Sequence, residues 1–555
     1  MLSHLTTPVK AVYEAYPFLT QLLVATSLCL ITTFLILHEI FKPVGKKRLQ
    51  TGQRPRLPPG PQGTPVWGNY ELFRKAQLDR DNAIVLPIAP FVLYCTHILT
   101  VMQFKRLASE YGEMTTLHIG QKTFVFLNTN RVVTELISKR SRLTSSRSPY
   151  PISSDLVSHG ARSLLQPEEE WWPRRKIQNS LLGNLKQYSA VQELESAQML
   201  AEYVFKPEGW YKHHFRFANS VIHRIALGER PNKSREELEE LQAVVHGYIG
   251  SLHVGSTYVD WFPSLATLLP KSLHSLWERG RYKHLRDWNH AVFHAWYDPV
   301  RDSVRTGTAP PSFVRDTLLH PDGKFSGTDD DACYIAMQLI EGGSDTTTSA
   351  LRNLVRAAVE QPAPFRRARE EIDRVCGTGE ETRLPTLDDM DSLRYICALV
   401  KEVLRWKPIF VSFPEHASTA DIEFEGYLFP QGVSFVPNGA AVCAECEEPD
   451  EFRPERWLDG HETDVTHGLW QFGGGKRICV GYRLAQRSLF LAAARLVWGV
   501  DFERREGDEA MKYGLKHHAG IDEPFPVKAT IRGEEYRKLI LEEAERLGVL
   551  EDAKG

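Results

Sequence analysis

The sequence predicts a mainly α fold with small β-sheets, preceded by one N-terminal transmembrane helix. The 555 residues are 42% hydrophobic and 25% charged, as in an ordinary globular protein. Helical spacing of apolar residues dominates after residue 104, whereas only one stretch has the pattern of a β-hairpin. Near the N-terminus, Phe18–Leu37 carries no charge, and about 20 apolar residues suffice to cross a bilayer.

The charges around the apolar run predict how the chain sits in the membrane. Only Lys10 precedes the run, whereas Lys42, Lys46, Lys47 and Arg48 follow it. Positive flanks stay in the cytosol, so we expect residues 1–16 outside the cytosol, an anchor at 17–41 and a cytosolic domain at 70–555. The alternative is that the run is a buried helix of a soluble domain.

Two segments follow the anchor before the helical body begins. Residues 42–69 are basic and rich in proline, which favours an extended, semi-rigid hinge. Residues 81–102 are strongly apolar but interrupted by Pro87 and Pro90. They are an atypical insertion in the catalytic domain, a membrane contact, or an artefact of the gene model.

The remaining elements are predicted in chain order. A short helix at 104–111 precedes a hairpin formed by 115–119 and 123–127 around Gly120-Gln121. Helical patterns then follow at 131–139, 171–182, 191–205, 235–252, 329–360, 363–375 and 534–547. Gln361-Pro362 separates two of these helices, because proline cannot continue the first.

Charge and cysteine content exclude several classes of protein. Lys+Arg 67 against Asp+Glu 70 gives a net charge of -3, so there is no electrostatic case for binding nucleic acid. Eight cysteines in 555 residues are too sparse for a disulfide scaffold. Cys443 and Cys446 form a CxxC pair, but no second pair completes a four-ligand zinc site, so we expect no metal or redox role there.

The sharpest chemical feature is the segment 472–481, FGGGKRICVG. Three consecutive glycines let the backbone approach something bulky and flat, and Cys479 follows them. A thiolate is a strong ligand for iron, and Arg477 could pair with a carboxylate. A phosphate-binding loop does not fit the pattern. A buried structural cysteine remains the alternative.

This segment resembles the FxxGxRxCxG heme-binding loop of the cytochrome P450 family at Phe472, Gly475, Arg477, Cys479 and Gly481. The resemblance covers nearly the whole chain after the anchor. It implies the cytochrome P450 fold and heme b (iron protoporphyrin IX) as cofactor, with Cys479 as the axial ligand of the iron. Phe472 and Arg477 are then cofactor-binding residues.

Other motifs of the family follow in the expected order. Residues 339–350, LIEGGSDTTTSA, resemble the helix in which an acid and a hydroxyl, here Asp345 and Thr346, deliver protons for oxygen activation. Trp171 and Arg175 match the WxxxR that binds a heme propionate, although Trp172 and Lys176 have the same spacing. His416 stands where the family often has another propionate-binding residue.

A further pair of motifs has a structural role in the family. Glu402 and Arg405 match ExxR, whose i, i+3 spacing puts both side chains on one helix face. Arg456, in FRPERW, is expected to join them in a buried network behind the heme.

By resemblance, the chain is a monooxygenase of the endoplasmic reticulum membrane that inserts one oxygen atom of O2 into a lipophilic substrate. It resembles fungal microsomal enzymes, many of which serve secondary metabolism. Because no flavin or nicotinamide motif is present, electrons are expected from NADPH–cytochrome P450 reductase, with cytochrome b5 as a second donor, and Lys476 could help the reductase to dock. The alternatives are a P450-type isomerase, dehydratase or coupling enzyme, and a noncatalytic membrane heme-binding module.

The resemblance also outlines a substrate pocket. It draws on residues 151–165, the helix before Gly342, residues 409–413 and a C-terminal loop at 518–525. The apolar side chains expected in it are those of Ile335, Ile409, Phe410, Val411 and Phe413.

Overall fold

The computed structural model describes most of the chain after residue 102. The described residues are 26–30, 32–33, 42–64, 67–70, 102–180, 183, 185–231, 234–252, 257–268, 270, 280–320, 323, 325–412, 414–505 and 525–554. The predicted anchor at 17–41 and the apolar segment at 81–102 lie almost entirely outside them. Among the helices described, none combines the length and apolarity needed to cross a membrane.

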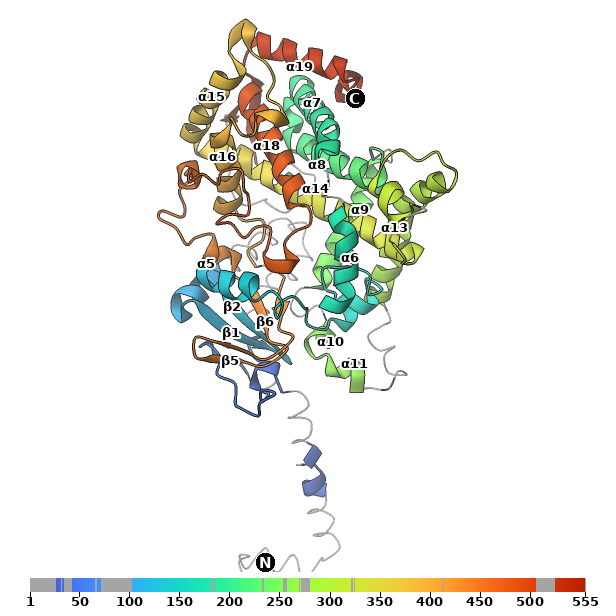
Figure 1. Ribbon diagram of the computed structural model, residues 1–555, viewed down its shortest axis with the longest axis vertical. Coiled ribbons are helices and arrows are strands. Elements are labelled where there is room, and N and C mark those ends of the chain that lie inside the picture. Colours follow the sequence, from blue (N-terminus) through green and yellow to red (C-terminus); the bar gives the residue numbers. More distant parts are fainter. Residues whose placement is uncertain are drawn as a thin grey trace, which may run out of the picture.

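The fold is helix-rich with small sheets, which confirms that part of the prediction (Figure 1). The helices are α5 (Asn130–Val133), α6 (Glu168–Ser180), α7 (Ser189–Phe205), α8 (Trp210–Leu227), α9 (Arg235–Ser251), α10 (Tyr258–Trp261), α11 (Ser264–Leu268), α13 (Arg281–Arg305), α14 (Asp329–Glu360), α15 (Pro362–Cys376), α16 (Arg394–Trp406), α17 (Gly439–Val442), α18 (Tyr482–Gly499), α19 (Glu534–Arg546) and α20 (Leu550–Lys554). The strands are β1 (Met114–Ile119), β2 (Lys122–Leu127), β3 (His416–Ala417), β4 (Ile422–Phe424), β5 (Tyr427–Phe429), β6 (Ser434–Pro437), β7 (Val500–Arg504) and β8 (Val527–Ile531).

The predicted hairpin is confirmed and forms the edge of the largest sheet. β1 pairs with β2 in antiparallel register, with Ile119 opposite Lys122 across the turn. β2 then pairs in parallel with β6, and β6 pairs with β3. The segment predicted as a hinge at 42–69 contacts two sheets. Val44 N–H donates to the Gln121 carbonyl in the turn between β1 and β2, and Arg56 forms a bridge with Leu428 of β5, in the β4–β5 sheet.

The helical body is organised around α14, which crosses the molecule beneath α8 and α18 (Figure 1). A capping box starts α14, because Thr328 Oγ1 accepts from the Asp331 N–H and the Asp331 carboxylate accepts from the Thr328 N–H. The helix then runs unbroken to Glu360. Gly342 and Gly343 lie within this one continuous helix.

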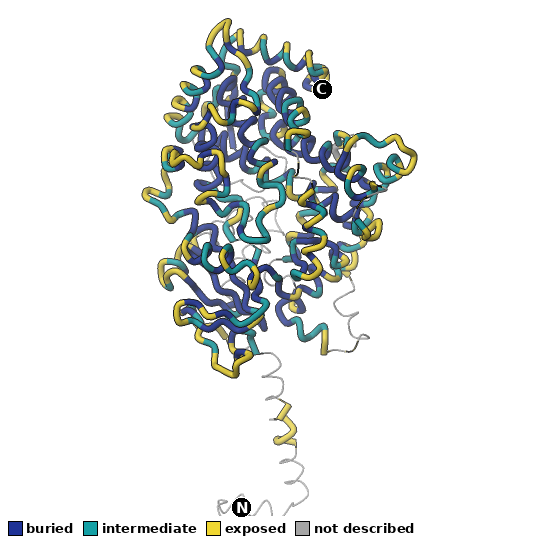
Figure 2. The backbone as a smooth tube through the Cα atoms, viewed as in Figure 1, coloured by how far each residue is buried: buried dark blue, intermediate teal, exposed yellow. Residues whose placement is uncertain are grey.

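The main core lies where α7, α8, α14, α16 and α18 meet. In Figure 2 the buried residues, drawn in dark blue, are concentrated in the interior of the domain. Trp210 and Trp498 are completely buried in it. Ile335 is also completely buried in this core. It does not line the main cavity, so its predicted place in the substrate pocket is wrong.

A buried charge network closes the region behind the Cys479 loop. The Glu402 carboxylate accepts two bonds of 2.8 Å from the Arg405 guanidinium and one of 3.2 Å from Arg456 Nε. The indole N–H of Trp457 donates to the same carboxylate at 2.9 Å. Glu402 is fully buried, so each of these partners offsets the cost of desolvating its charge.

We expect Glu402→Ala to lower the free energy of unfolding by about 3–5 kcal/mol, because Arg405 would be left buried without its counter-ion. Thermal or denaturant unfolding of the purified protein measures this change. Glu423→Ala is the matched control, since Glu423 is exposed on β4. Equal losses in the two variants would contradict the role assigned to the network.

Candidate active site

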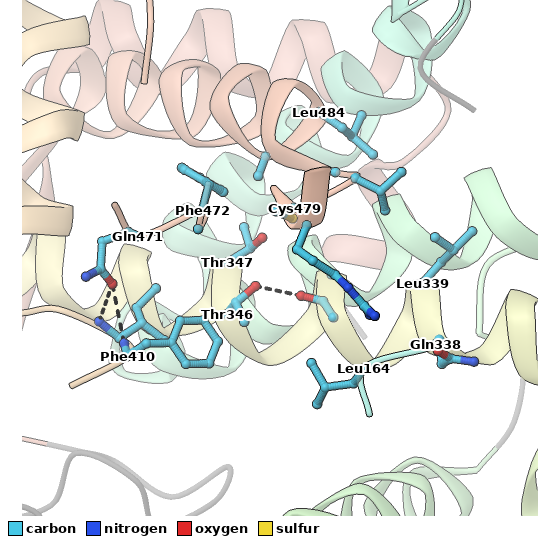
Figure 3. A pocket seen from close by; sticks show the side chains of 18 of the residues that line it. Leu164, Gln338, Leu339, Thr346, Thr347, Phe410, Gln471, Phe472, Cys479 and Leu484 are labelled. Carbon is cyan, nitrogen blue, oxygen red and sulfur yellow. Dashed lines mark hydrogen bonds between the residues drawn. The ribbon is translucent and has the colours of Figure 1, made fainter. Parts of the chain in front are cut away.

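A cavity of about 390 Å³ lies between α14 and the loop that precedes α18. Figure 3 shows Cys479 projecting into this cavity from the loop, with Thr346 and Thr347 facing it from α14. Two apolar side chains also line the cavity: Leu339, which precedes Thr346 in α14, and Leu164. The cavity therefore has a thiol on one side and hydroxyl groups on the other.

The cysteine loop is held in a tight conformation by its own backbone. The Cys479 N–H donates to the Phe472 carbonyl at 2.8 Å, which closes the loop. Gly475 has a φ of 60°, and a Cβ there would lie 2.5 Å from the Ile137 carbonyl oxygen. Only glycine fits this close approach. The glycines thus bring the loop against its neighbour and turn Cys479 toward the cavity.

The Cys479 thiol has an accessible surface, and that surface faces the cavity rather than the outside of the molecule. Burial raises the pKa of this thiol, whereas the Gly481 N–H and the Arg175 guanidinium lower it. The last two effects stabilise a thiolate, as a hydrogen-bond donor and a cation beside the sulfur should. Because burial is the largest effect, the pKa of the thiol is raised overall, and the thiolate would be favoured once a cation binds to the sulfur.

Positive charge gathers on the same side of the cavity. Arg147, Arg175, Arg477 and His416 line it, and among the described lining residues there is no carboxylate. Arg477 donates to the carbonyls of Ser145, Ser163 and Gln166, and its guanidinium lies 3.9 Å from the Trp171 ring centroid. Burial, followed by the nearby Arg147, lowers the pKa of Arg477 to about 8.

α6 supplies Trp171 and Arg175 to the cavity, both of them buried. Trp172 and Lys176, which have the same spacing, are exposed and do not line the cavity. α6 begins at Glu168, three residues before the predicted start. Arg175 donates to the Ile478 carbonyl, next to Cys479, so α6 is tied directly to the cysteine loop.

His416 is buried in β3 and its Nδ1 lies 2.8 Å from the Thr144 carbonyl oxygen. Burial and the cations Arg147 and Arg477 lower its pKa to about 3. Its ring is therefore neutral at pH 7, with Nδ1 donating its proton to that carbonyl. A carboxylate in the cavity would favour the protonated form and so oppose this shift.

Asp345 and Thr346 are neighbours in sequence but face different surroundings. Thr346 lines the cavity and its Oγ1 donates to the Gly342 carbonyl at 2.6 Å (Figure 3). The Asp345 carboxylate instead lies 3.4 Å from His246 Nε2 and accepts from the Gln242 amide at 3.2 Å, both on α9. The hydrogen bond that the His246 ring donates to the Asp345 carboxylate raises the pKa of His246.

Sequence reasoning missed Arg147 and Gln471, which both line the cavity. Neither lies in a motif that the sequence analysis used. The side-chain Oε1 of Gln471 accepts hydrogen bonds from the backbone N–H groups of Ile409 and Phe410 (Figure 3). This amide fixes the segment that brings both apolar side chains to the cavity.

Other predicted residues lie away from the cavity. Val411 packs in a separate cluster beside β1 and β2, so its predicted place in the pocket is wrong. Phe413 and residues 518–524 lie outside the described residues.

The CxxC pair is separate from the cavity wall. Cys443 and Cys446 are both free thiols, and the Cys443 sulfur accepts from the side-chain amide of Gln471 at 3.4 Å.

The two glycines of α14 make different contacts. A Cβ at Gly343 would lie 2.7 Å from Ile222 on α8, whereas a Cβ at Gly342 would meet no atom within 4 Å. Gly342 thus leaves room at the cavity wall, and Gly343 lets α8 and α14 pack closely.

We expect Gly343→Ala to lower the thermal unfolding midpoint, because the new methyl group would displace Ile222. Gly342→Ala should leave the midpoint unchanged or raise it, since alanine favours a helix by about 0.5–1 kcal/mol over glycine. Thermal unfolding of the two variants side by side tests the contrast. A larger loss in Gly342→Ala would contradict this packing.

Comparison with known proteins identifies the family to which the chain is similar. The family model described as Cytochrome P450 matches residues 87–519, more than half of the chain. The chain is 32% identical over 477 residues to cytochrome P450 monooxygenase fogE of Aspergillus ruber, covering 82% of each chain. It is 28% identical over 566 residues to cytochrome P450 monooxygenase atE of Aspergillus terreus, covering 98% of each.

Solved structures agree at the level of the fold. A zebra fish cytochrome P450 determined with progesterone superposes with a TM-score of 0.61 at 22% identity. The superposition covers 78% of this chain and 99% of that one.

Proposed function

Because the chain belongs to the cytochrome P450 family, we propose that it inserts one oxygen atom of O2 into a lipophilic organic substrate, with electrons from NADPH through a reductase. Its named relatives are monooxygenases, so the chain is a cytochrome P450 monooxygenase and heme b is its cofactor. The observation that carries the proposal is the Cys479 thiol facing the Thr346 hydroxyl across an apolar cavity.

The residues around the cavity fit heme b. Cys479 would hold the iron, and Arg147, Arg175 and Arg477 would meet its two carboxylates. The guanidinium groups would then be paired with the two carboxylates, which lowers the cost of burying several positive charges together. Trp171 and Phe472, both in the cavity wall, would contact the flat ring. When bound, the heme activates dioxygen, and the thiolate favours O–O bond cleavage.

The opposite part of the cavity supports a lipophilic substrate. Its walls include Ile222, Leu339, Ile409 and Phe410. The amide of Gln338 is occupied by the protein, because it accepts from the Ser163 N–H and donates to the Tyr334 carbonyl. Substrate would therefore be selected by shape and apolar contact more than by hydrogen bonding. The fungal origin of the relatives supports a role in secondary metabolism.

Thr346 and Asp345 would share the delivery of protons. The Thr346 hydroxyl stands in the cavity, where it can hold or pass a proton at the reacting centre. Asp345 would act from outside the cavity, since it pairs with His246, whose side chain is 54% exposed. The carboxylate of Asp345 raises the pKa of His246, so this pair would favour holding a proton beside the residue that precedes Thr346.

The reductase, cytochrome b5 and the endoplasmic reticulum membrane remain part of this proposal. The matched family and the basic segment after residue 41 support them. Lys476 is a weaker candidate for reductase docking than the sequence indicates, because its ammonium group is paired with Glu168 at 2.6 Å. Arg477 is partly buried and its guanidinium group donates to backbone carbonyls, which makes it a weak docking candidate as well.

The proposal is tested by incubating the purified holoenzyme, NADPH and a reductase with a library of apolar compounds under labelled dioxygen. We expect a product that gains one labelled oxygen atom per molecule. A product of altered structure without label would instead indicate an isomerase, dehydratase or coupling enzyme, and would contradict oxygen insertion.

Replacing Thr346 tests the hydroxyl in the cavity. We expect Thr346→Ala to lower product formation roughly 100-fold, the usual contribution of a positioned proton donor, while the heme content stays unchanged. Thr346→Ser keeps the hydroxyl and should retain most of the rate. Product per NADPH consumed is the decisive ratio. An unchanged ratio in Thr346→Ala would show that the hydroxyl is not used.

A further inference from the structure

A second cluster of metal-binding side chains lies away from the cavity, where α13 packs along α14 (Figure 1). His290 and His294 come from α13, and Asp330 comes from the first turn of α14. One ligand atom from each lies within 4.8 Å of the others. Histidines four residues apart share one helix face, a spacing that zinc sites use. We propose that these residues bind a divalent transition metal ion, Zn²⁺ above all.

The distances fit a tetrahedral ion. His294 Nε2 lies 3.1 Å and His290 Nε2 lies 3.6 Å from the same oxygen of Asp330. Bonds of about 2.0–2.2 Å in tetrahedral geometry place neighbouring ligand atoms roughly 3.4 Å apart. The two imidazole rings stack with centroids 4.3 Å apart, and the Nε2 atom of each is its atom nearest to the Asp330 oxygen in the ion pairs above. Three protein ligands would leave the fourth position to water.

The hydrogen bonding of His294 is an independent observation that points to a ligand. Its Nδ1 lies 2.9 Å from the Asp298 carboxylate, which in turn accepts from Arg301 at 2.8 Å. An Nδ1–H that donates to a carboxylate fixes the tautomer and directs a lone pair from Nε2, as in zinc sites. His294 Nε2 is buried and makes no hydrogen bond of adequate geometry among the described residues, although the Asp330 oxygen lies 3.1 Å away. A cation between Nε2 and Asp330 would satisfy both atoms.

The surroundings extend the site toward the active-site cavity. The His159 ring lies 5.5 Å from that of His290, and His159 has a φ of 52°, a strained conformation for a residue other than glycine. Ser163 and Leu164, which line the cavity, follow shortly after it. A bound ion would therefore join α13 to α14 beside the segment that leads to the cavity wall.

The test uses the full-length holoenzyme, free of any affinity tag and stripped with a chelator, titrated with Zn²⁺ against a chromogenic indicator. We expect one tightly bound zinc and a higher thermal unfolding midpoint when it binds. His294→Ala and Asp330→Asn should each weaken binding about tenfold or more and remove the thermal shift. Asp298→Asn should weaken binding by 10- to 100-fold through the orientation of His294.

His284→Ala is the matched control, because His284 is an exposed histidine of the same helix outside the cluster. It should bind zinc as the unmodified chain does. Asp330 is 57% exposed, so Asp330→Asn tests the ligand without disturbing a buried group.

No tightly bound zinc ion in the titration, or equal zinc affinity in His294→Ala and the control, would overturn the proposal. Sulfur ligands in the zinc X-ray absorption spectrum would place the ion at cysteines and would overturn it too. The proposal does not depend on the proposed function.

Discussion

The concentration of buried positive charge beside one thiol is the constraint on which the rest of the site depends. Arg147, Arg175 and Arg477 enter the cavity from different parts of the chain, and the described lining residues offer them no carboxylate. Backbone carbonyls hold the guanidinium groups in place, and the buried Glu415, which does not line the cavity, offsets only part of the charge of Arg147 and Arg477. Buried charges are stable when they are paired. The protein is therefore built around an anionic, flat ligand, and heme b supplies both the carboxylates and the iron for Cys479.

The fold brings the groups of this site together from both ends of the domain. α14 forms one continuous wall of the cavity. Gly342 leaves space at this wall, and Gly343 allows α8 to pack closely against α14. The cysteine loop reaches the opposite wall because Gly475 can approach the Ile137 carbonyl. Behind the loop, Glu402 gathers Arg405, Arg456 and Trp457 into one network. The chemistry thus rests on rigid elements, which suits a site that must hold the ligand and a proton donor at fixed positions.

Local sequence patterns predicted the elements and many of the site residues, because each depends on short-range spacing. The hairpin, the long helix up to Gln361-Pro362 and the placement of Cys479 are of this kind. What depends on tertiary packing was not predictable. Ile335 has the helical spacing of a cavity residue but turns into the core, and Asp345 faces His246 rather than Thr346. Arg147 belongs to no motif that we used, and only the folded chain brings it beside Arg477. The stretch 17–41, predicted as an anchor, lies largely outside the described residues.

The central claim is that Cys479, as a thiolate, is the axial ligand of a heme in this cavity. The most direct test is the reduced, carbon monoxide difference spectrum of membranes that contain the full-length chain, recorded beside Cys479→Ala. The account predicts the red-shifted Soret band of thiolate-ligated heme in the unmodified chain and its loss in the variant. The same band in Cys479→Ala, or no heme in a correctly folded unmodified chain, would contradict it.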